Sequence, residues 1–231
     1  MYSDGGKHCF SCGYHVVSNG IARFLTGQSR TLVVDRVLYT VTLPEDAEPS
    51  YPDFALKWCE QYEIGRNQLL RHKVLWSDSR ALLIFPYYSN GGLYAWQGRY
   101  FGKEKKPKWI SYGKIHETLY ILGQPSNILV CVEDIMSAIK VSRYVPCLPL
   151  FGSHINTRQL LAILQKYDTI YFWLDPDKQK ESLGFTEKAA VFMKAGTILS
   201  DKDPKEHTYK EIGEILLAKS IIDLNQTSLA A

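Results

Sequence analysis

The chain has 231 residues, of which 45% are hydrophobic and 22% are charged. That length allows one or two compact units, and that composition excludes a fibrous or largely disordered protein. The net charge of +3 is too small to predict nucleic-acid binding by itself. No apolar run reaches the roughly 20 residues that a membrane helix needs, and the first residues lack a signal-peptide pattern. We therefore expect a cytoplasmic protein that makes no membrane contact.

The sequence begins with a short segment that contains a Cys-x-x-Cys pair, Cys9 and Cys12. Five cysteines without a secretory signal argue against disulfides, so we expect this pair to bind metal and the other three cysteines to be buried. Tetrahedral zinc needs four ligands. His8, His15 or another chain could complete the set. Alternatively, the segment could be a metal-free remnant, or a first cysteine pair could precede Met1 in a longer gene product.

The middle of the chain has the pattern of a mixed α+β structure. β-branched residues in partial alternation predict strand structure over 31–43, and an acidic, proline-rich linker is expected over 44–52. Large apolar residues at helical spacing predict a helix over 54–62 and a second, short helix over 67–72. A hairpin is expected over 80–97, because its central Asn-Gly supplies the positive φ that tight hairpin turns require.

A basic and aromatic segment follows this hairpin. The segment 99–114 contains six lysine and arginine residues but only one acid, Glu104, and Tyr100, Trp109 and Tyr112 are interleaved with them. Such a segment could hold phosphates and stack bases. A solvated loop with ordinary aromatic anchors has the same composition, and the segment taken alone favours that simpler interpretation.

From residue 128 onward, short apolar runs alternate with helical stretches. This alternation predicts a parallel sheet with helices on its faces. The expected elements, in chain order, are strand 128–132, helix 134–144, strand 147–151, helix 156–167, strand 169–174, helix 185–194, strand 197–200 and helix 209–218.

Carboxylates follow three of these four strands. Glu133 follows the first strand, and Asp175 with Asp177 follows the third. Asp203 comes shortly after the fourth. Side chains at the carboxyl ends of parallel strands converge on one crevice, so we expect these acids to meet there and to bind Mg²⁺ or Mn²⁺ for phosphoryl transfer. Each acid could instead be a helix cap or a turn residue.

The sequences around these acids resemble the three signatures of Toprim domains, in order and in spacing. They are VEDIMSAI at 132–139, WLDPDK at 173–178 and KDPKE at 202–206. The usual first signature has glycine after the glutamate and an acid four residues beyond it, where this chain has Asp134 and Ser137. That departure leaves the role of Asp134 open.

The resemblance implies roles for four acids. Glu133 would act at the reacting phosphate or help to hold a metal ion, and Asp175 and Asp177 would carry divalent ions. Asp203 would be a further metal ligand. We therefore treat Glu133, Asp175 and Asp177 as the candidate catalytic residues.

The segments outside these signatures distinguish among Toprim proteins. Ile-Phe-Pro and Trp-Gln-Gly-Arg within 84–99, with Pro-Lys-Trp-Ile-Ser at 107–111, resemble the catalytic subdomain of bacterial and phage primases. This resemblance implies that Arg99 and Lys108 contact nucleotide phosphates or the template strand. The segment 2–13 resembles the second half of the zinc ribbon with which such primases recognise their template.

These observations predict an α/β fold, α+β overall, with a Toprim domain behind a mixed primase subdomain. The expected parts are a partial zinc-ribbon-like segment with its linker at 1–45, the primase subdomain at 46–125, the Toprim domain at 126–220 and a flexible tail at 221–231.

The predicted function is that of a DNA primase, which makes short RNA primers on single-stranded DNA from nucleoside triphosphates, with Mg²⁺ or Mn²⁺ and with zinc as a further candidate. The sequence contains no Gly-x-x-x-x-Gly-Lys-Ser/Thr loop, so we expect a phage-like, stand-alone primase in the host cytoplasm and a separate replicative helicase as its partner. Two alternatives are a Toprim nuclease that uses the same acids and a DNA-binding replication accessory protein with a decayed site.

Overall fold

The structure is a computed structural model, and it divides the chain into two compact units, 1–38 and 39–231. The domain boundaries expected from the sequence stay predictions. The residues that the structure describes are 7–8, 15–16, 41–89, 91–117, 119–152 and 154–223.

In the first unit, two short strands are described. Strand β1 (Lys7–His8) pairs antiparallel with β2 (His15–Val16), and His8 lies opposite His15 in the register. Cys9 and Cys12 lie outside the described residues. Zinc binding therefore stays a prediction, and so does the ribbon.

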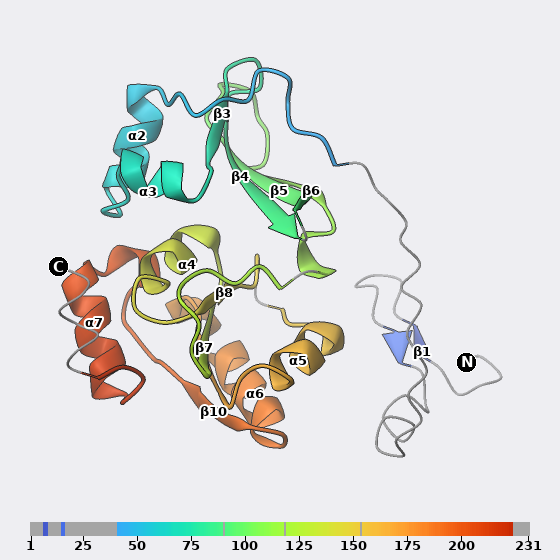
Figure 1. Cartoon of the computed structure of the whole chain (residues 1–231), viewed down its shortest axis with the longest axis vertical. Coiled ribbons are helices and arrows are strands. Elements are labelled where there is room, and N and C mark those ends of the chain that lie inside the picture. The colour runs from blue at the N-terminus through green and yellow to red at the C-terminus, as the bar shows by residue number, and fades with distance from the viewer. Residues whose placement is uncertain are drawn as a thin grey trace. The chain divides into compact units, whose positions relative to one another are not determined.

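The second unit contains an antiparallel sheet in the order β3-β4-β5-β6 (Figure 1). The predicted hairpin is confirmed, because β4 pairs antiparallel with β5, Ser89 lies opposite Gly92, and Gly91 has a φ of 78°. The four strands are β3 (Leu75–Ser77), β4 (Leu82–Ser89), β5 (Gly92–Tyr100) and β6 (Trp109–Gly113).

Strand β4 is buried on both of its faces over most of its length, which explains its uninterrupted apolar run. Leu83 and Phe85 face the main core, where they meet residues of helices α2 (Asp53–Glu60) and α3 (Arg66–Arg71). Leu82, Ile84 and Trp96 form a separate cluster on the opposite face. Alternate residues of one strand therefore serve two different surfaces.

The segment 44–52, which composition suggests as a linker, packs against β3. The amide of Glu48 donates to the carbonyl of Trp76 at 3.0 Å, and Ser77 Oγ donates to Asp46 Oδ1 at 2.7 Å. The hydroxyl of Tyr51, which is buried, donates to the carbonyl of Val74 at 2.7 Å. Prolines and acids here therefore accompany an ordered edge of the sheet rather than a free connection.

The remainder of the second unit is built on a parallel sheet in the order β10-β9-β7-β8, as the alternating pattern predicts. One face packs with residues of α4 and α7 in the main core, and the other packs with residues of α5 and α6. The elements are β7 (Ile128–Val132), α4 (Ile135–Val141), β8 (Cys147–Pro149), α5 (Thr157–Leu164), β9 (Thr169–Trp173), α6 (Gln179–Ala190), β10 (Lys194–Thr197) and α7 (Tyr209–Ala218), with 3₁₀ turns η1 (Ile115–Glu117), η2 (Pro176–Lys178) and η3 (Pro204–Glu206).

Two predicted starts are wrong, and the predicted ends of α4, β8, α5 and α6 lie two to four residues too far along the chain. Helix α6 begins at Gln179, six residues before the expected start, because its first turns are polar and carry no apolar stripe. Strand β10 is Lys194–Thr197 rather than 197–200, because it is an edge strand with only partial burial, while the apolar Ile198 lies just beyond it. The two errors do not move the carboxylates away from the strand ends.

Cys59, Cys131 and Cys147 are free and buried, as expected for small apolar side chains. Burial raises the pKa of Cys59 to about 12, so this thiol is inert. Within the described ranges, no helix is long and apolar enough to cross a membrane.

Candidate active site

The topology brings the ends of β7 and β9 together. These strands are parallel neighbours, and Val132 lies opposite Trp173, so Glu133 and Asp175 follow at nearly the same level. From β7 the chain continues to β8 at one edge of the sheet, and from β9 it continues to β10 at the other edge. Such a divergence opens a crevice at the carboxyl ends of the strands, where α/β proteins bind their ligands.

Glu133 and Asp175, which follow these strand ends, each have one buried carboxylate oxygen without a partner among the described residues. Glu133 Oε2 and Asp175 Oδ1 are buried and accept no hydrogen bond in the part of the chain that is described. Burial raises the pKa of Asp175 to about 7, although nearby Lys205 opposes that shift. Burial also raises the pKa of Glu133, and the charges of Asp134 and Asp177 add to it. Buried oxygens of this kind are ready to accept a cation or a proton.

The turns that follow β9 and β10 are built alike. Asp175 and Asp203 each precede a proline that starts a 3₁₀ turn, and both have the extended backbone that a residue before proline favours. Neither carboxylate caps its own turn, so capping does not account for these acids. Asp177, in contrast, has a side chain that is 75% exposed, and its Oδ2 lies 3.8 Å from Lys178 Nζ.

Asp134 has a structural role that the sequence left open. Its Oδ1 accepts a hydrogen bond from the amide of Ser137 at 2.9 Å, which caps the N-terminus of α4. Its Oδ2 accepts from Lys205 Nζ at 2.8 Å. Asp134 therefore joins the first acidic signature to the third.

Lys205 lies among the carboxylates, a position that sequence reasoning missed although the residue is part of the third signature. Its Nζ is 2.5 Å from Asp203 Oδ2 and 3.7 Å from Asp175 Oδ2, in addition to its bond to Asp134. Burial alone would lower the pKa of Lys205, but Asp134, Asp203 and Asp175 outweigh it and raise that pKa. We call Glu133, Asp134, Asp175 and Asp203 the carboxylate cluster.

Over the described ranges, no three or more histidine, cysteine, aspartate or glutamate side chains form a ready-made set of metal ligands. The unpartnered oxygens of Glu133 and Asp175 nevertheless have the hard-oxygen chemistry that Mg²⁺ and Mn²⁺ prefer. The expected metal-binding roles of Glu133, Asp175, Asp177 and Asp203 therefore stay predictions.

Arg99 lies in an aromatic box on the face of the antiparallel sheet that belongs to the main core. Its guanidinium is 5.1 Å from the centre of the Trp58 ring and 5.8 Å from that of Trp109, and its Nε has no hydrogen-bond partner within the described residues. Burial lowers the pKa of Arg99, but a guanidinium stays charged in proteins. This fixed cation is available to an anion.

Tyr62 connects this box to the carboxylate cluster. Its ring packs edge-on against Trp58 at 5.6 Å. Burial raises the pKa of Tyr62, and the phenol also senses the charges of Lys205, Asp134 and Arg99. Sequence reasoning assigned Tyr62 only to an apolar helix pattern, so nothing in the sequence singled it out.

Lys108 is exposed, and the described part of the chain shows no contact between its side chain and these groups.

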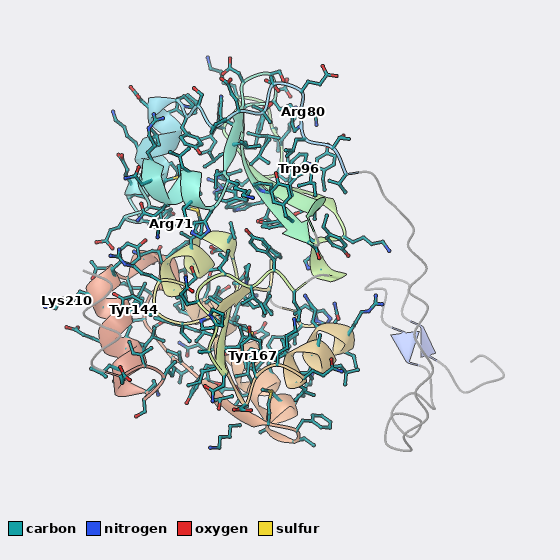
Figure 2. All side chains as sticks on the ribbon, in the orientation of Figure 1. Arg71, Arg80, Trp96, Tyr144, Tyr167 and Lys210 are labelled. Carbon is teal, nitrogen blue, oxygen red and sulfur yellow. The ribbon has the colours of Figure 1, made fainter. Side chains whose placement is uncertain are left out.

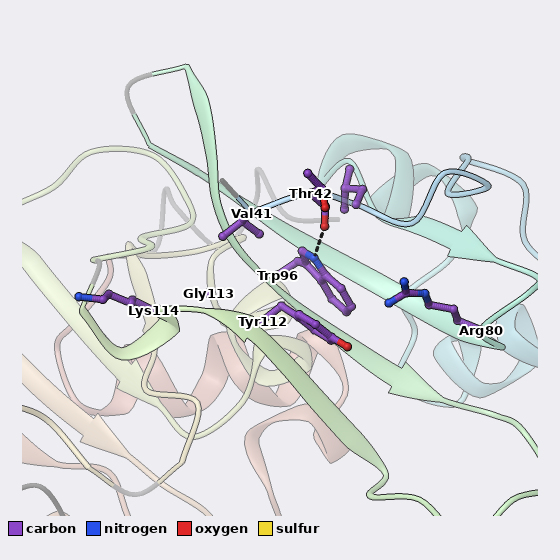
Figure 3. A pocket seen from close by; sticks show the side chains of 8 residues that line it. Val41, Thr42, Arg80, Trp96, Tyr112, Gly113 and Lys114 are labelled. Carbon is purple, nitrogen blue, oxygen red and sulfur yellow. Dashed lines mark hydrogen bonds between the residues drawn. The ribbon is translucent and has the colours of Figure 1, made fainter. Parts of the chain in front are cut away.

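A second concavity lies on the opposite face of the antiparallel sheet. Cavities of about 460 and 390 Å³ share Arg80 and Tyr112, and Figure 3 shows how the ring of Tyr112 stacks on that of Trp96, with centres 4.2 Å apart. Trp96 Nε1 donates to the carbonyl of Thr42 at 3.0 Å, which fixes the stack. Figure 2 places Arg80 and Trp96 in the same half of the molecule. We call this surface the Trp96 groove; its lining includes Arg80, Trp96, Tyr100, Lys106, Tyr112 and Lys114.

The basic and aromatic segment 99–114 therefore divides between two surfaces. Arg99 pairs with Trp109 across β5 and β6 on the core face, whereas Trp96 pairs with Tyr112 on the other. The alternation of side chains along each strand produces this division.

No protein-family profile and no curated protein matches the chain in sequence. Among solved structures, the zinc-binding and RNA polymerase domains of the Aquifex aeolicus primase are similar, with a TM-score of 0.59 and 13% identity over 73% of this chain and 56% of that one. A DnaG primase catalytic domain bound to single-stranded DNA gives a TM-score of 0.49 and 17% identity, over 79% of this chain and 67% of that one. A DNA primase domain from Pseudomonas aeruginosa gives 0.46 and 13%, over 74% and 63%.

The chain thus spans little more than half the length of the Aquifex aeolicus structure. At 13% identity, this similarity establishes the fold: a mixed α/β arrangement of an antiparallel and a parallel sheet, as in primase cores.

Proposed function

We propose that this chain is a Toprim-type primase, which synthesises short RNA primers on single-stranded DNA. The observation that carries the proposal is the pair of unpartnered carboxylate oxygens, on Glu133 and Asp175, at the adjoining ends of β7 and β9 in a primase-like fold. Arg99 contacts Trp58, which also packs against Tyr62, and Tyr62 senses the charges of both Arg99 and the carboxylate cluster. We therefore propose that the guanidinium of Arg99 binds the phosphates of a nucleotide.

In this mechanism the residues of the chain position and deprotonate the reactants. Glu133, whose pKa is raised by burial, accepts the proton of the attacking 3′-hydroxyl. The hydroxyl oxygen bonds to the α-phosphorus of the incoming nucleotide, and pyrophosphate leaves. Arg99 balances charge on the triphosphate. Asp175, Asp177 and Glu133 would hold Mg²⁺ or Mn²⁺, which supplies charge neutralisation at the phosphates when bound.

The Trp96 groove suits the template. Its exposed, stacked Tyr112 offers a base a flat apolar surface, and Arg80 and Lys114 carry positive charge beside it for the phosphate backbone. The charge of Lys106 in the same groove is balanced by Glu104, whose Oε2 lies 2.6 Å from Lys106 Nζ. Because stacking does not depend on base identity, this groove would hold single-stranded DNA of any sequence. Lys108, which is exposed and directly precedes β6, is proposed as a further contact to the DNA backbone.

Primer synthesis is tested with single-stranded DNA, the four ribonucleotides and Mg²⁺, by resolving labelled products on a gel. We expect oligoribonucleotides that require the template and disappear in Glu133→Gln. Nicking of a plasmid by the protein and metal alone, without nucleotides, would instead indicate a nuclease. DNA binding with neither reaction would indicate an accessory protein.

The remaining expectations extend this proposal. Zinc at Cys9 and Cys12, a separate replicative helicase and a phage-like, cytoplasmic setting are proposed from the sequence. Metal analysis of the purified protein tests the zinc: a molar equivalent of zinc supports it, and metal-free protein that still recognises its template contradicts it.

A further inference from the structure

Lys205 places a positive charge inside the carboxylate cluster. Its Nζ lies within 4 Å of carboxylate oxygens of Asp134, Asp175 and Asp203, at 2.8, 3.7 and 2.5 Å. Its side chain is only 16% exposed, so the ammonium belongs to the cluster and not to the solvent. Three anions therefore surround one organic cation at the place where the resemblance predicts divalent ions.

The backbone of Lys205 is also held in place. The buried ammonium of Lys140 donates to the carbonyl of Lys205 at 3.3 Å and to the carbonyl of His207. Pro204, just before it, is buried and starts the 3₁₀ turn η3. The turn cannot move away from the cluster without breaking these bonds, so Lys205 is presented to the acids by the fold.

The carboxylates are unequally supplied with partners. Asp134 and Asp203 accept hydrogen bonds from Lys205, whereas Glu133 Oε2 and Asp175 Oδ1 are buried and accept none from the residues that the structure describes. The ammonium of Lys205 therefore neutralises Asp134 and Asp203 most directly, and Glu133 Oε2 and Asp175 Oδ1 are the oxygens of the cluster that a metal ion could bind.

We propose that Lys205 is a built-in cation that occupies the place of a second divalent ion, so that the chain binds a single Mg²⁺ or Mn²⁺ ion, at Glu133 and Asp175 with Asp177 as the further ligand proposed above. The inference rests on the proposed function, since it describes how that site is charged. Lys205 is a positioning residue: it holds Asp134 and Asp203 and repels a further cation from their side of the cluster.

The test is a count of bound Mn²⁺ by electron paramagnetic resonance of the free ion, on the full chain without nucleotide or DNA. We expect a single ion for the wild type, a second ion for Lys205→Gln, and a single ion for the charge-preserving Lys205→Arg. Removal of a like charge within 4 Å should tighten the second ion at least about tenfold. Asp175→Asn should weaken the first ion.

Two ions on the wild type, no ion at all, or the same count in Lys205→Gln and wild type would overturn the inference. If Lys205→Gln does not fold, the wild-type count still decides, because two ions contradict the proposal and a single ion that is displaced by Asp175→Asn supports it. The count is independent of primer synthesis. If the protein binds a single ion but makes no primers, the role of Lys205 stands and the primase function is refuted. If it makes primers and binds two ions, the primase function stands and the role of Lys205 is refuted.

Discussion

The buried ammonium of Lys140, on α4, lies 3.1 Å from Glu63 Oε2 in the segment between α2 and α3. The same oxygen accepts from the amide of Tyr209 at 2.9 Å, so one carboxylate ties three parts of the second unit together. Lys140 also supports the turn that carries Lys205. The framework of the carboxylate cluster therefore depends on a lysine that is itself 1% exposed.

Lys140→Met should destabilise the protein by about 2–4 kcal/mol, because the carbonyls of Lys205 and His207 lose this donor and Glu63 loses its ion-pair partner. Urea unfolding measures the change. The matched control is Lys210→Met, since Lys210 projects from α7 (Figure 2) with a side chain that is 87% exposed, and its ion pair to Glu214 should contribute less than about 0.5 kcal/mol. Equal effects of the two substitutions would contradict this role.

Asp175 should make the metal-free protein less stable as pH rises. Its pKa is about 7 in the folded protein and 3.8 when unperturbed, so the folded state binds the proton more tightly. The associated stability is complete below pH 3.8 and is lost as pH rises to about 7. Glu133 adds a contribution of the same sign.

The measurement is denaturant unfolding in EDTA at pH 5 and pH 8. The wild type should lose ~2 kcal/mol more than Asp175→Asn over this interval, because asparagine cannot titrate. A wild type and variant with parallel pH profiles would show that Asp175 is not desolvated.

Arg99→Ala should weaken nucleotide binding. The guanidinium lies 5.1 and 5.8 Å from the ring centres of Trp58 and Trp109 and has no carboxylate partner among the described residues, so its loss should raise KM for the nucleotides about tenfold or more. Arg71→Ala is the control, because Arg71 is an exposed residue at the end of α3, labelled in Figure 2. Unchanged KM in Arg99→Ala would remove Arg99 from the site.

Tyr112→Ala should weaken binding of single-stranded DNA by about 1–3 kcal/mol, the usual contribution of one stacked base. Fluorescence anisotropy with a labelled oligonucleotide measures it. Phe192→Ala is a suitable control, since Phe192 is 62% exposed and lies outside the lining of the Trp96 groove. If both variants bind like the wild type, the DNA lies elsewhere.

The strand ends and the acids that follow them could be predicted from the sequence because buried parallel strands consist of short apolar runs, such as 128–132, and a carboxylate directly after one is conspicuous. The starts of α6 and of the edge strand β10 were harder to predict from the sequence. The first turns of α6 contribute mainly Ser182 to the core, through a bond from its hydroxyl to the carbonyl of Phe172 at 3.0 Å. A polar contact of that kind leaves no apolar pattern.

Sequence reasoning could not find Lys205 and Tyr62 as parts of the site, for a physical reason. Lys205 lies beside Asp134 only because separate turns converge in space, 71 residues apart in the chain. Tyr62 has the helical spacing of an ordinary core aromatic, and its nearness to charges from both halves of the unit depends on tertiary packing. The sequence likewise suggested that segment 99–114 forms one basic and aromatic surface. The pairing of β5 with β6 shows that its residues lie on two opposite faces of the sheet.

The most direct test of the central claim is the rate of primer synthesis by Asp175→Asn beside that of Asp168→Asn. Both acids flank β9, but Asp168 lies before its amino end, where it accepts a hydrogen bond from Asn127 Nδ2 at 3.0 Å. We predict that Asp175→Asn loses at least about 100-fold in rate, because it removes a carboxylate from the reacting phosphates, and that Asp168→Asn stays within about twofold of the wild type. Wild-type rates in Asp175→Asn, with the protein folded, would contradict the account.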